Sequence, residues 1–176
     1  MKKPIIFTIG HSTHSIDKFI TLLKTYNVQT VVDIRTIPKS RHNPQFNKTN
    51  LELALKQESI SYEFIENLGG LRHTNKNSVN LGWRNRSFRG YADYMATVEF
   101  EVGLKSLIKI ANDKVSVIMC AEVLPWRCHR SLVSDALIKQ GWLVRDIMSL
   151  TKASRHTLTS FLKVNNGQIT YPEPKS

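Results

Sequence analysis

Short apolar runs alternate along the chain with segments in which apolar residues recur at helical spacing. Runs rich in β-branched residues are typical of buried strands, and recurrence every three or four residues is typical of helices. We expect strands at 5–9, 30–34, 62–65, 115–119 and 143–147. We expect helices at 16–26, at 51–57, at 91–111 in two stretches around Gly103, and at 130–140, with Ser15 capping the first and Gly141 ending the last.

This alternation of strands and helices predicts the fold. A strand, a helix and a second strand close in sequence form a right-handed unit whose strands are parallel. Repetition of the unit predicts a three-layer, Rossmann-like α/β fold with a mainly parallel sheet and flanking helices. A chain of 176 residues, 41% of them hydrophobic, suits one domain. We assign 1–165 to it and expect 166–176, with Pro172 and Pro174, to be a frayed tail.

One long segment, 67–89, interrupts the periodic pattern. It is rich in Gly, Asn and Arg, and its apolar residues show little periodicity. A loop of this length is usually functional or mobile. We therefore expect a lid here.

Targeting features favour a cytoplasmic protein with no membrane partner. No apolar run reaches the roughly 18 to 20 residues of a membrane helix, and the N-terminus leads directly into a strand rather than a signal peptide. The only two cysteines, Cys120 and Cys128, are typical of intracellular thiols rather than of a disulfide framework.

The net charge of +11 is the unusual global property of the chain. It favours partners that carry phosphate, but it constrains nonspecific binding more than mechanism. Many basic residues cluster at 39–48 and 72–89, whereas others, such as Lys105, lie on the expected solvent faces of helices.

Polar residues follow three of the expected strands at positions where a simple fold does not require them. The carboxyl ends of parallel strands share one edge of a sheet, and open α/β sheets bind ligands there, where the strand order reverses. We therefore expect one pocket at this edge. Its residues would come from Gly10-His11-Ser12, Asp33 to Arg35, and Cys120-Ala121-Glu122.

Three of these residues are candidates for catalysis. His11 has the chemistry of a general acid or base, or of a metal ligand, although it could equally be an ordinary loop histidine. Asp33 could orient a ligand, act as a base, or only pair with Arg35. Glu122 could position a polar group or act as a base.

Two arginines are candidates for binding an anion. The guanidinium groups of Arg35 and Arg130 offer planar donors that match phosphate or carboxylate. Arg130 also stands at the start of an expected helix, whose free N–H groups favour negative charge. The alternative for Arg130 is an ordinary ion pair with Glu122.

The two cysteines permit a thiol site with His129. Cys128 lies near a helix start beside His129, an environment that can activate a thiol. A rhodanese or cysteine-phosphatase loop places five residues between its Cys and its Arg, whereas six separate Cys120 from Arg127, which disfavours thiol catalysis. A zinc or iron site with His11 is also disfavoured because no paired CxxC motif is present, so we assign no metal, and the sequence does not identify a cofactor.

Several ordered motifs resemble a bacterial and archaeal family, the domain-of-unknown-function family 488. They span roughly 7–147. The resemblance implies a compact α/β fold and a shared site, in which Ser12, Ser40 and Asn47 join the arginines as candidate ligand-binding residues; it implies no reaction or substrate. The motifs are Thr8-Ile9-Gly10-His11-Ser12, Val32-Asp33-Ile34-Arg35, Pro38, Ser40, Pro44-Gln45-Phe46-Asn47, Leu68-Gly69-Gly70, Met119-Cys120-Ala121-Glu122, Pro125 and Cys128-His129-Arg130.

Three functional hypotheses follow. The first is an enzyme that acts on a phosphate-bearing small molecule or nucleic-acid component at the strand ends. The second is a noncatalytic nucleic-acid-binding module, and the third is a thiol or metal sensor at Cys120 and Cys128. The second would use the aromatic residues Phe46, Trp83, Phe88 and Tyr91 for stacking and the basic residues Arg84, Arg86 and Arg89 for phosphate contacts.

Overall fold

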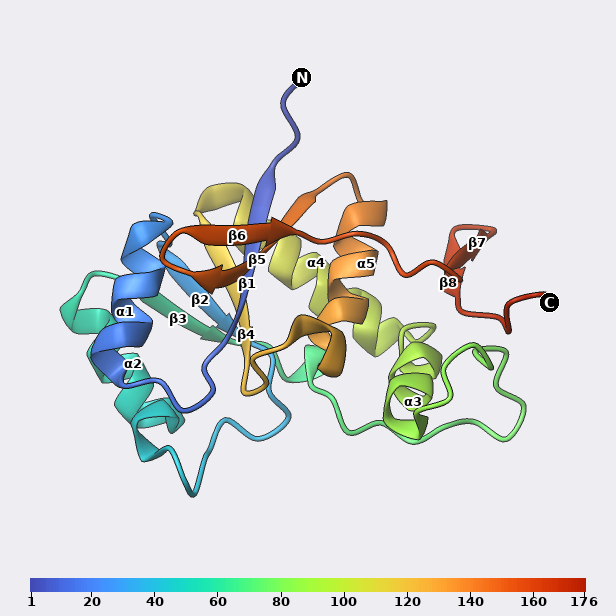
Figure 1. Ribbon diagram of the computed structural model, residues 1–176, viewed down its shortest axis with the longest axis horizontal. Helices are drawn as coiled ribbons and strands as arrows, with labels where there is room; N and C mark the ends of the chain where they lie inside the picture. The colour runs from blue at the N-terminus through green and yellow to red at the C-terminus, as the bar shows by residue number, and fades with distance from the viewer.

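A six-stranded sheet forms the middle layer of the molecule (Figure 1). The computed structural model describes residues 1–176. The strand order is β3-β2-β4-β1-β5-β6, with β1 to β5 parallel and β6 antiparallel to β5. The strands are β1 (Ile5–Gly10), β2 (Thr30–Asp33), β3 (Ser61–Phe64), β4 (Ser116–Cys120), β5 (Leu143–Ser149) and β6 (Lys152–Arg155). The expected mainly parallel sheet is confirmed, and β6 is an edge strand that the sequence analysis missed.

Helices cover both faces of the sheet, as expected for a single three-layer α/β domain. One apolar core lies under α1 (Ile16–Thr25) and α2 (Lys48–Gln57). The other lies under α3 (Arg86–Tyr94), α4 (Val98–Asp113) and α5 (Arg130–Lys139). Strand β4 supplies both cores, because Val117 and Met119 belong to the first and Ile118 to the second. This two-sided burial explains the continuous apolar runs of the central strands.

Helix boundaries follow local chemistry. The Ser15 hydroxyl accepts a hydrogen bond from the Lys18 backbone N–H, so the expected cap of α1 is confirmed. Gly141 has φ +93°, a conformation that glycine adopts readily, and it follows the end of α5. The expected helix 91–111 is two helices, but they separate at 95–97 and not near Gly103. At Gly103, inside α4, a Cβ atom would come within 2.9 Å of the Asn67 Cβ atom.

The segment 67–89, expected to be an irregular lid, is anchored to the domain. Its first two residues belong to the short helix η2 (Glu66–Leu68), and its last residues belong to α3. The buried Asp93 carboxylate accepts hydrogen bonds from the Asn75 backbone N–H, the Ser78 hydroxyl and the Asn80 amide, at 2.6–2.8 Å. These polar anchors give no periodic signal, which is why the sequence pattern suggested a free loop.

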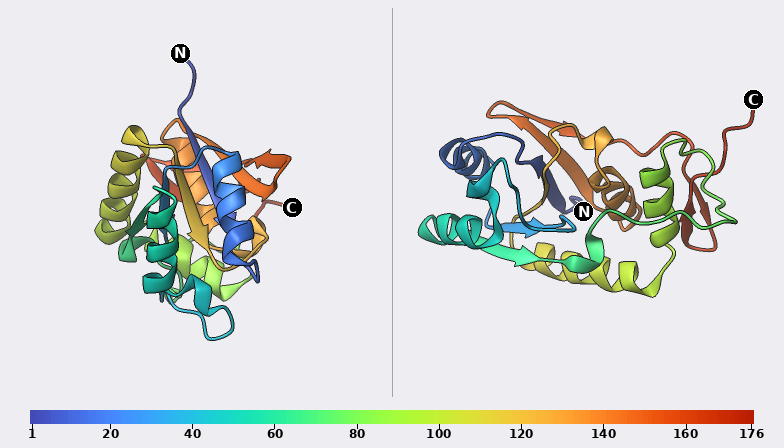
Figure 2. Two further views of the ribbon diagram at one scale, coloured as in Figure 1. Left: turned by 90° about the vertical axis from the view of Figure 1, so that its left-hand side faces the viewer. Right: turned by 90° about the horizontal axis from the view of Figure 1, so that it is seen from below.

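The C-terminal segment is packed rather than frayed as far as Tyr171. A hairpin of β7 (Lys163–Asn165) and β8 (Gln168–Thr170) lies beside α3 (Figures 1 and 2). Tyr171 is fully buried, its N–H donates to the Asn80 side chain at 2.8 Å, and its hydroxyl donates to Asp135 at 2.9 Å. The expectation of a tail that frays from residue 166 is therefore wrong for 168–171. Asn80 and Asp135 are too distant in sequence to be recognised as its partners.

A protonated histidine bridges two buried carboxylates near this segment. His156 Nε2 lies 3.2 Å from Asp135, and its Nδ1 lies 3.4 Å from Asp146. Burial alone would lower the pKa of His156, but its hydrogen bonds and its attraction to Asp135 and Asp146 raise that pKa to about 9. The imidazolium thus ties together α5, β5 and the chain that follows β6.

We expect this bridge to make stability depend on pH. Because the folded-state pKa of His156 lies above the ordinary 6.5, its stabilisation is complete below pH 6.5 and is lost as the pH rises through about 9. The free energy of unfolding should fall over this window by on the order of 2–3 kcal/mol. Urea denaturation at pH 6, 7.5 and 9.5 measures it.

The matched variants are His156→Gln and, as a control, His42→Gln at an exposed histidine. We expect His156→Gln to flatten the decline above pH 6.5 and His42→Gln to keep it. An equally steep decline in His156→Gln would contradict the bridge.

Candidate functional site

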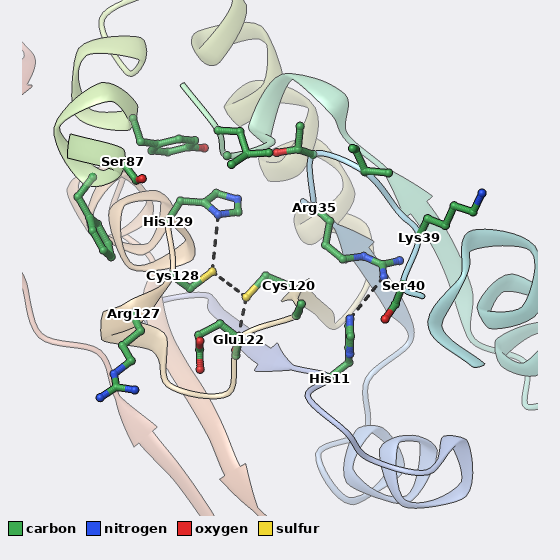
Figure 3. A pocket seen from close by; sticks show the side chains of 17 residues that line it. His11, Arg35, Lys39, Ser40, Ser87, Cys120, Glu122, Arg127, Cys128 and His129 are labelled. Carbon is green, nitrogen blue, oxygen red and sulfur yellow. Dashed lines mark hydrogen bonds between the residues drawn. The ribbon is translucent and has the colours of Figure 1, made fainter. Parts of the chain in front are cut away.

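A cavity of about 420 Å³ opens at the carboxyl ends of the parallel strands. Neighbouring strands β1 and β4 send their connections in opposite directions, since α1 leads from β1 toward β2 and α5 leads from β4 toward β5. The predicted switch-point crevice is therefore located between them. Its polar lining comes from the three predicted strand ends, the loop after Arg35, the start of α3, and η3 (Pro125–Arg127) with the two residues that follow it (Figure 3). The polar residues are His11, Arg35, Thr36, Lys39, Ser40, Ser87, Cys120, Glu122, Arg127, Cys128 and His129.

Gly10 allows two of the strand-end loops to pack together. A Cβ atom at this position would lie 1.8 Å from the Glu122 carbonyl oxygen, so only glycine fits. Beyond the strands, the His11 N–H donates to the Cys120 carbonyl and the Ser12 N–H donates to the Ala121 carbonyl, each at 2.9 Å. Backbone pairing thus fixes the position of His11 relative to Cys120.

A buried ion pair fixes the orientation of Arg35. Its Nε atom lies 3.0 Å from Asp33 Oδ1 and its Nη2 atom lies 2.7 Å from Asp33 Oδ2. The Tyr62 hydroxyl donates to the same carboxylate at 2.6 Å, and burial followed by the Asp33 charge raises the pKa of Tyr62 far above its usual value. Asp33 is completely buried and does not line the cavity, whereas Arg35 does. Of the roles considered for Asp33, the geometry matches pairing with Arg35.

His11 is a neutral hydrogen-bonding group. Its Nδ1–H donates to the Ser12 carbonyl at 2.8 Å, which leaves Nε2 as an acceptor 3.4 Å from Arg35 Nη1. The ring stacks on Phe46 with centroids 4.3 Å apart. Burial lowers the pKa of His11 to about 4. At neutral pH, Nε2 therefore offers a lone pair toward the cavity and toward Arg35.

Arg130 lies behind the cavity wall. Its Nη1 donates to Cys120 Sγ at 3.1 Å and to the Glu122 carbonyl at 2.9 Å, and its Nη2 donates to the Val123 carbonyl at 2.7 Å. Only 1% of the residue is exposed, and it does not line the cavity. Arg130 is therefore not placed to contact an anion in the cavity, although the sequence had suggested this contact. It also forms no ion pair with the Glu122 carboxylate, because it donates to the Glu122 backbone carbonyl instead. The arginine that reaches Cys120 is Arg130, and not Arg127, whose spacing from Cys120 was compared with known loops.

The two thiols and His129 form a connected group beside the cavity (Figure 3). Cys128 Sγ lies 2.7 Å from Cys120 Sγ and 3.6 Å from His129 Nδ1. His129 Nε2–H donates to the Ile34 carbonyl at 2.9 Å, so its Nδ1 is free to accept a hydrogen bond. Burial lowers the pKa of His129 to about 4. No group of three or more His, Cys, Asp or Glu side chains is arranged to hold a metal ion.

Of the remaining predicted residues, some line the cavity and others hold lining residues in place. Glu122 lines the cavity, and its carboxylate accepts a hydrogen bond from the Leu124 N–H at 3.3 Å. Ser40 also lines it, and the Asn47 side chain holds the Ser40 backbone N–H at 2.7 Å from outside. Ser12 contributes only its backbone.

Sequence reasoning missed two cations of the lining, Lys39 and Arg127. Lys39 begins the basic cluster at 39–48, and Arg127 is three residues before the start of α5, but nothing local distinguishes either from other surface charges.

The aromatic residues proposed for base stacking mostly pack inside the protein. Phe46 is fully buried, and Trp83 packs on Phe88 and, edge-on, on Phe161. Phe88 and Tyr91 do line the cavity. None of the helices combines the length and apolar character needed to cross a membrane.

Comparison with known proteins identifies a family but no activity. Neither the curated proteins nor the solved structures gave a match. The family model described as Domain of unknown function DUF488 matches residues 15–137, a stretch that runs from the cap of α1 into α5 and includes all the lining residues named above except His11. Because this match covers more than half of the chain, the protein belongs to the DUF488 family.

Proposed function

We propose that this protein is an enzyme that acts on a phosphate-bearing small molecule or nucleic-acid component bound in the strand-end cavity. The observation that carries the proposal is Arg35, a cavity-lining guanidinium held in one orientation by the buried Asp33 carboxylate. A preoriented guanidinium binds phosphate without first losing side-chain freedom.

The charge of the lining supports an anionic ligand. Arg35, Lys39 and Arg127 contribute three cations, against the single carboxylate of Glu122. The net charge of +11 adds a positive field that draws anions toward the molecule. The cavity volume of about 420 Å³ falls in the range of small-molecule sites.

The lining also supplies groups that can move or hold a proton. Glu122 lines the cavity, and its carboxylate serves as the general base. His11 accepts a hydrogen bond at Nε2 and, being neutral, orients a hydroxyl or amine of the ligand. Asp33 is a positioning residue, because its oxygens are occupied by Arg35 and Tyr62.

Thermal unfolding tests the binding site. A ligand at 100 times its dissociation constant stabilises a fold by about 2.7 kcal/mol, or roughly 5–10 °C at this chain length. We expect one or more members of a panel of nucleotides, sugar phosphates and pyrophosphate to produce such a shift. Arg35→Lys, which keeps the charge but loses the fork of donors, should lose most of it.

The control variant is Arg84→Ala, which removes an exposed cation outside the cavity lining and should keep the shift. An unchanged shift in Arg35→Lys would contradict the site. A shift produced only by DNA or RNA, lost in Arg84→Ala and erased by salt, would support the nucleic-acid-binding module instead.

A second variant separates binding from chemistry. With a substrate from the panel, Glu122→Gln should bind with a dissociation constant within about threefold of the wild type, while turnover falls by about 10²–10⁴-fold, the usual contribution of a general base. Calorimetric titration and product formation measure the two quantities. Wild-type turnover in Glu122→Gln would remove Glu122 from the mechanism.

A further inference from the structure

Two thiols face each other at the cavity, at the ends of separate elements. Cys120 is the last residue of β4, and Cys128 joins η3 to α5. Their sulfur atoms are 2.7 Å apart, which is longer than the roughly 2.05 Å of a disulfide bond but short enough for the two sulfurs to join after a small movement. Both residues line the cavity, although each is more than 90% buried. A small molecule can therefore reach them from the cavity, while the surface of another protein cannot.

Arg130 holds the connecting loop in place and favours a thiolate at Cys120. Its guanidinium donates to the carbonyls of Glu122 and Val123 and to the Cys120 sulfur. Burial raises the pKa of Cys120, but the hydrogen bond from Cys128 and the charge of Arg130 outweigh burial, so this pKa lies below its usual value. Cys120 is thus the nucleophile of the pair.

Cys128 retains its proton and has a hydrogen-bond acceptor beside it. Its hydrogen bond to Cys120, and then burial, raise the pKa of Cys128 well above its usual value. Its sulfur lies 3.6 Å from His129 Nδ1, the nitrogen left unprotonated because Nε2–H donates to Ile34. Cys128 can therefore donate a hydrogen bond to the Cys120 sulfur or to His129 Nδ1, and it keeps its proton in both cases because the pKa of His129 is lowered to about 4.

We propose that Cys120 and Cys128 form a redox-active dithiol that reduces a disulfide bond in a small molecule. The Cys120 thiolate attacks one sulfur of the substrate disulfide, so that a mixed disulfide forms and the first substrate thiolate leaves and takes a proton from water. Cys128 then attacks Cys120 Sγ, and its proton passes to the second substrate thiolate. The Cys120–Cys128 bond forms, and the bond between Cys120 and the substrate sulfur breaks.

The electrons and protons balance in this sequence. The protein dithiol loses two electrons, and the substrate disulfide gains them and becomes two thiols. One proton comes from Cys128 and one from water. A low-molecular-weight thiol returns the protein to the dithiol form by the reverse exchange. The reaction goes beyond the proposed anion site, because a neutral disulfide does not require Arg35.

The test uses 2-hydroxyethyl disulfide, a small uncharged substrate, with the reduced full-length protein under anaerobic conditions. We expect the wild type to lose two hydrogens in intact mass, to lose both maleimide-reactive thiols and to release two 2-mercaptoethanol molecules per chain. Cys128→Ser should stop at the mixed disulfide, with one 2-mercaptoethanol attached to Cys120. Cys120→Ser should react at least tenfold more slowly than the wild type, because the remaining thiol holds its proton.

His129→Asn tests the positioning role of the histidine. Its mixed disulfide should accumulate before the internal disulfide forms, because the Cys128 thiol loses the acceptor that orients it. Arg84→Ala, outside the cavity lining, is the control and should react like the wild type.

Three results would overturn the proposal. The wild type could keep both thiols, the wild type could form only mixed or intermolecular disulfides, or Cys120→Ser could react as fast as the wild type. The first two results come from the mass of the wild-type protein, so they do not depend on whether a variant folds. Because the substrate is uncharged, the dithiol proposal and the anion-site proposal are tested independently. Disulfide reduction can be absent while anion binding is observed, and disulfide reduction can be observed while anion binding is absent.

Discussion

The buried pair of Asp33 and Arg35 is the interaction on which the site depends. Asp33 ends β2 with no exposed surface, and four groups satisfy its oxygens: the backbone N–H, Nε and Nη2 of Arg35 and the hydroxyl of Tyr62. Loss of one partner from such a pair would leave an uncompensated buried charge, at a typical cost of about 3–5 kcal/mol. The same constraint that makes the pair sensitive to substitution also keeps one guanidinium edge beside His11 and the cavity.

The fold places two kinds of chemistry at one sheet edge. Because β4 lies between β2 and β1, the residues that follow these three strands become neighbours. Arg35 and His11 form one side of the site, and Cys120, Cys128 and His129 form the other. Gly10 permits the close approach of the β1 and β4 loops that joins the two sides. A polar cation group and a dithiol group thus share one cavity while each keeps its own buried support, Asp33 for the first and Arg130 for the second.

The sequence predicted what depends on apolar periodicity and missed what depends on long-range polar contacts. The five parallel strands and the convergence of His11, Arg35 and Cys120 followed from buried runs and from the geometry of parallel sheets. Strand β6 was missed because its sequence, Lys-Ala-Ser-Arg, carries edge-strand charges and no apolar run. The anchoring of Tyr171 and Asp93 depends on side chains distant in sequence, which no local pattern indicates. The contact between Cys120 and Arg130 was also missed. The spacing of known Cys–Arg loops directed attention to Arg127, whereas the loop after Cys120 is long enough for Arg130 to turn back beneath it.

The most direct measurement is the affinity of pyrophosphate for Asp33→Asn, determined by calorimetric titration beside the wild type. The substitution removes a negative charge near the cavity, so long-range electrostatics alone would strengthen anion binding. If Asp33 acts by orienting Arg35, the affinity should instead fall, by about tenfold or more, in a variant whose circular dichroism spectrum shows it to be folded. Affinity equal to or tighter than that of the wild type would contradict a site organised by the Asp33–Arg35 pair.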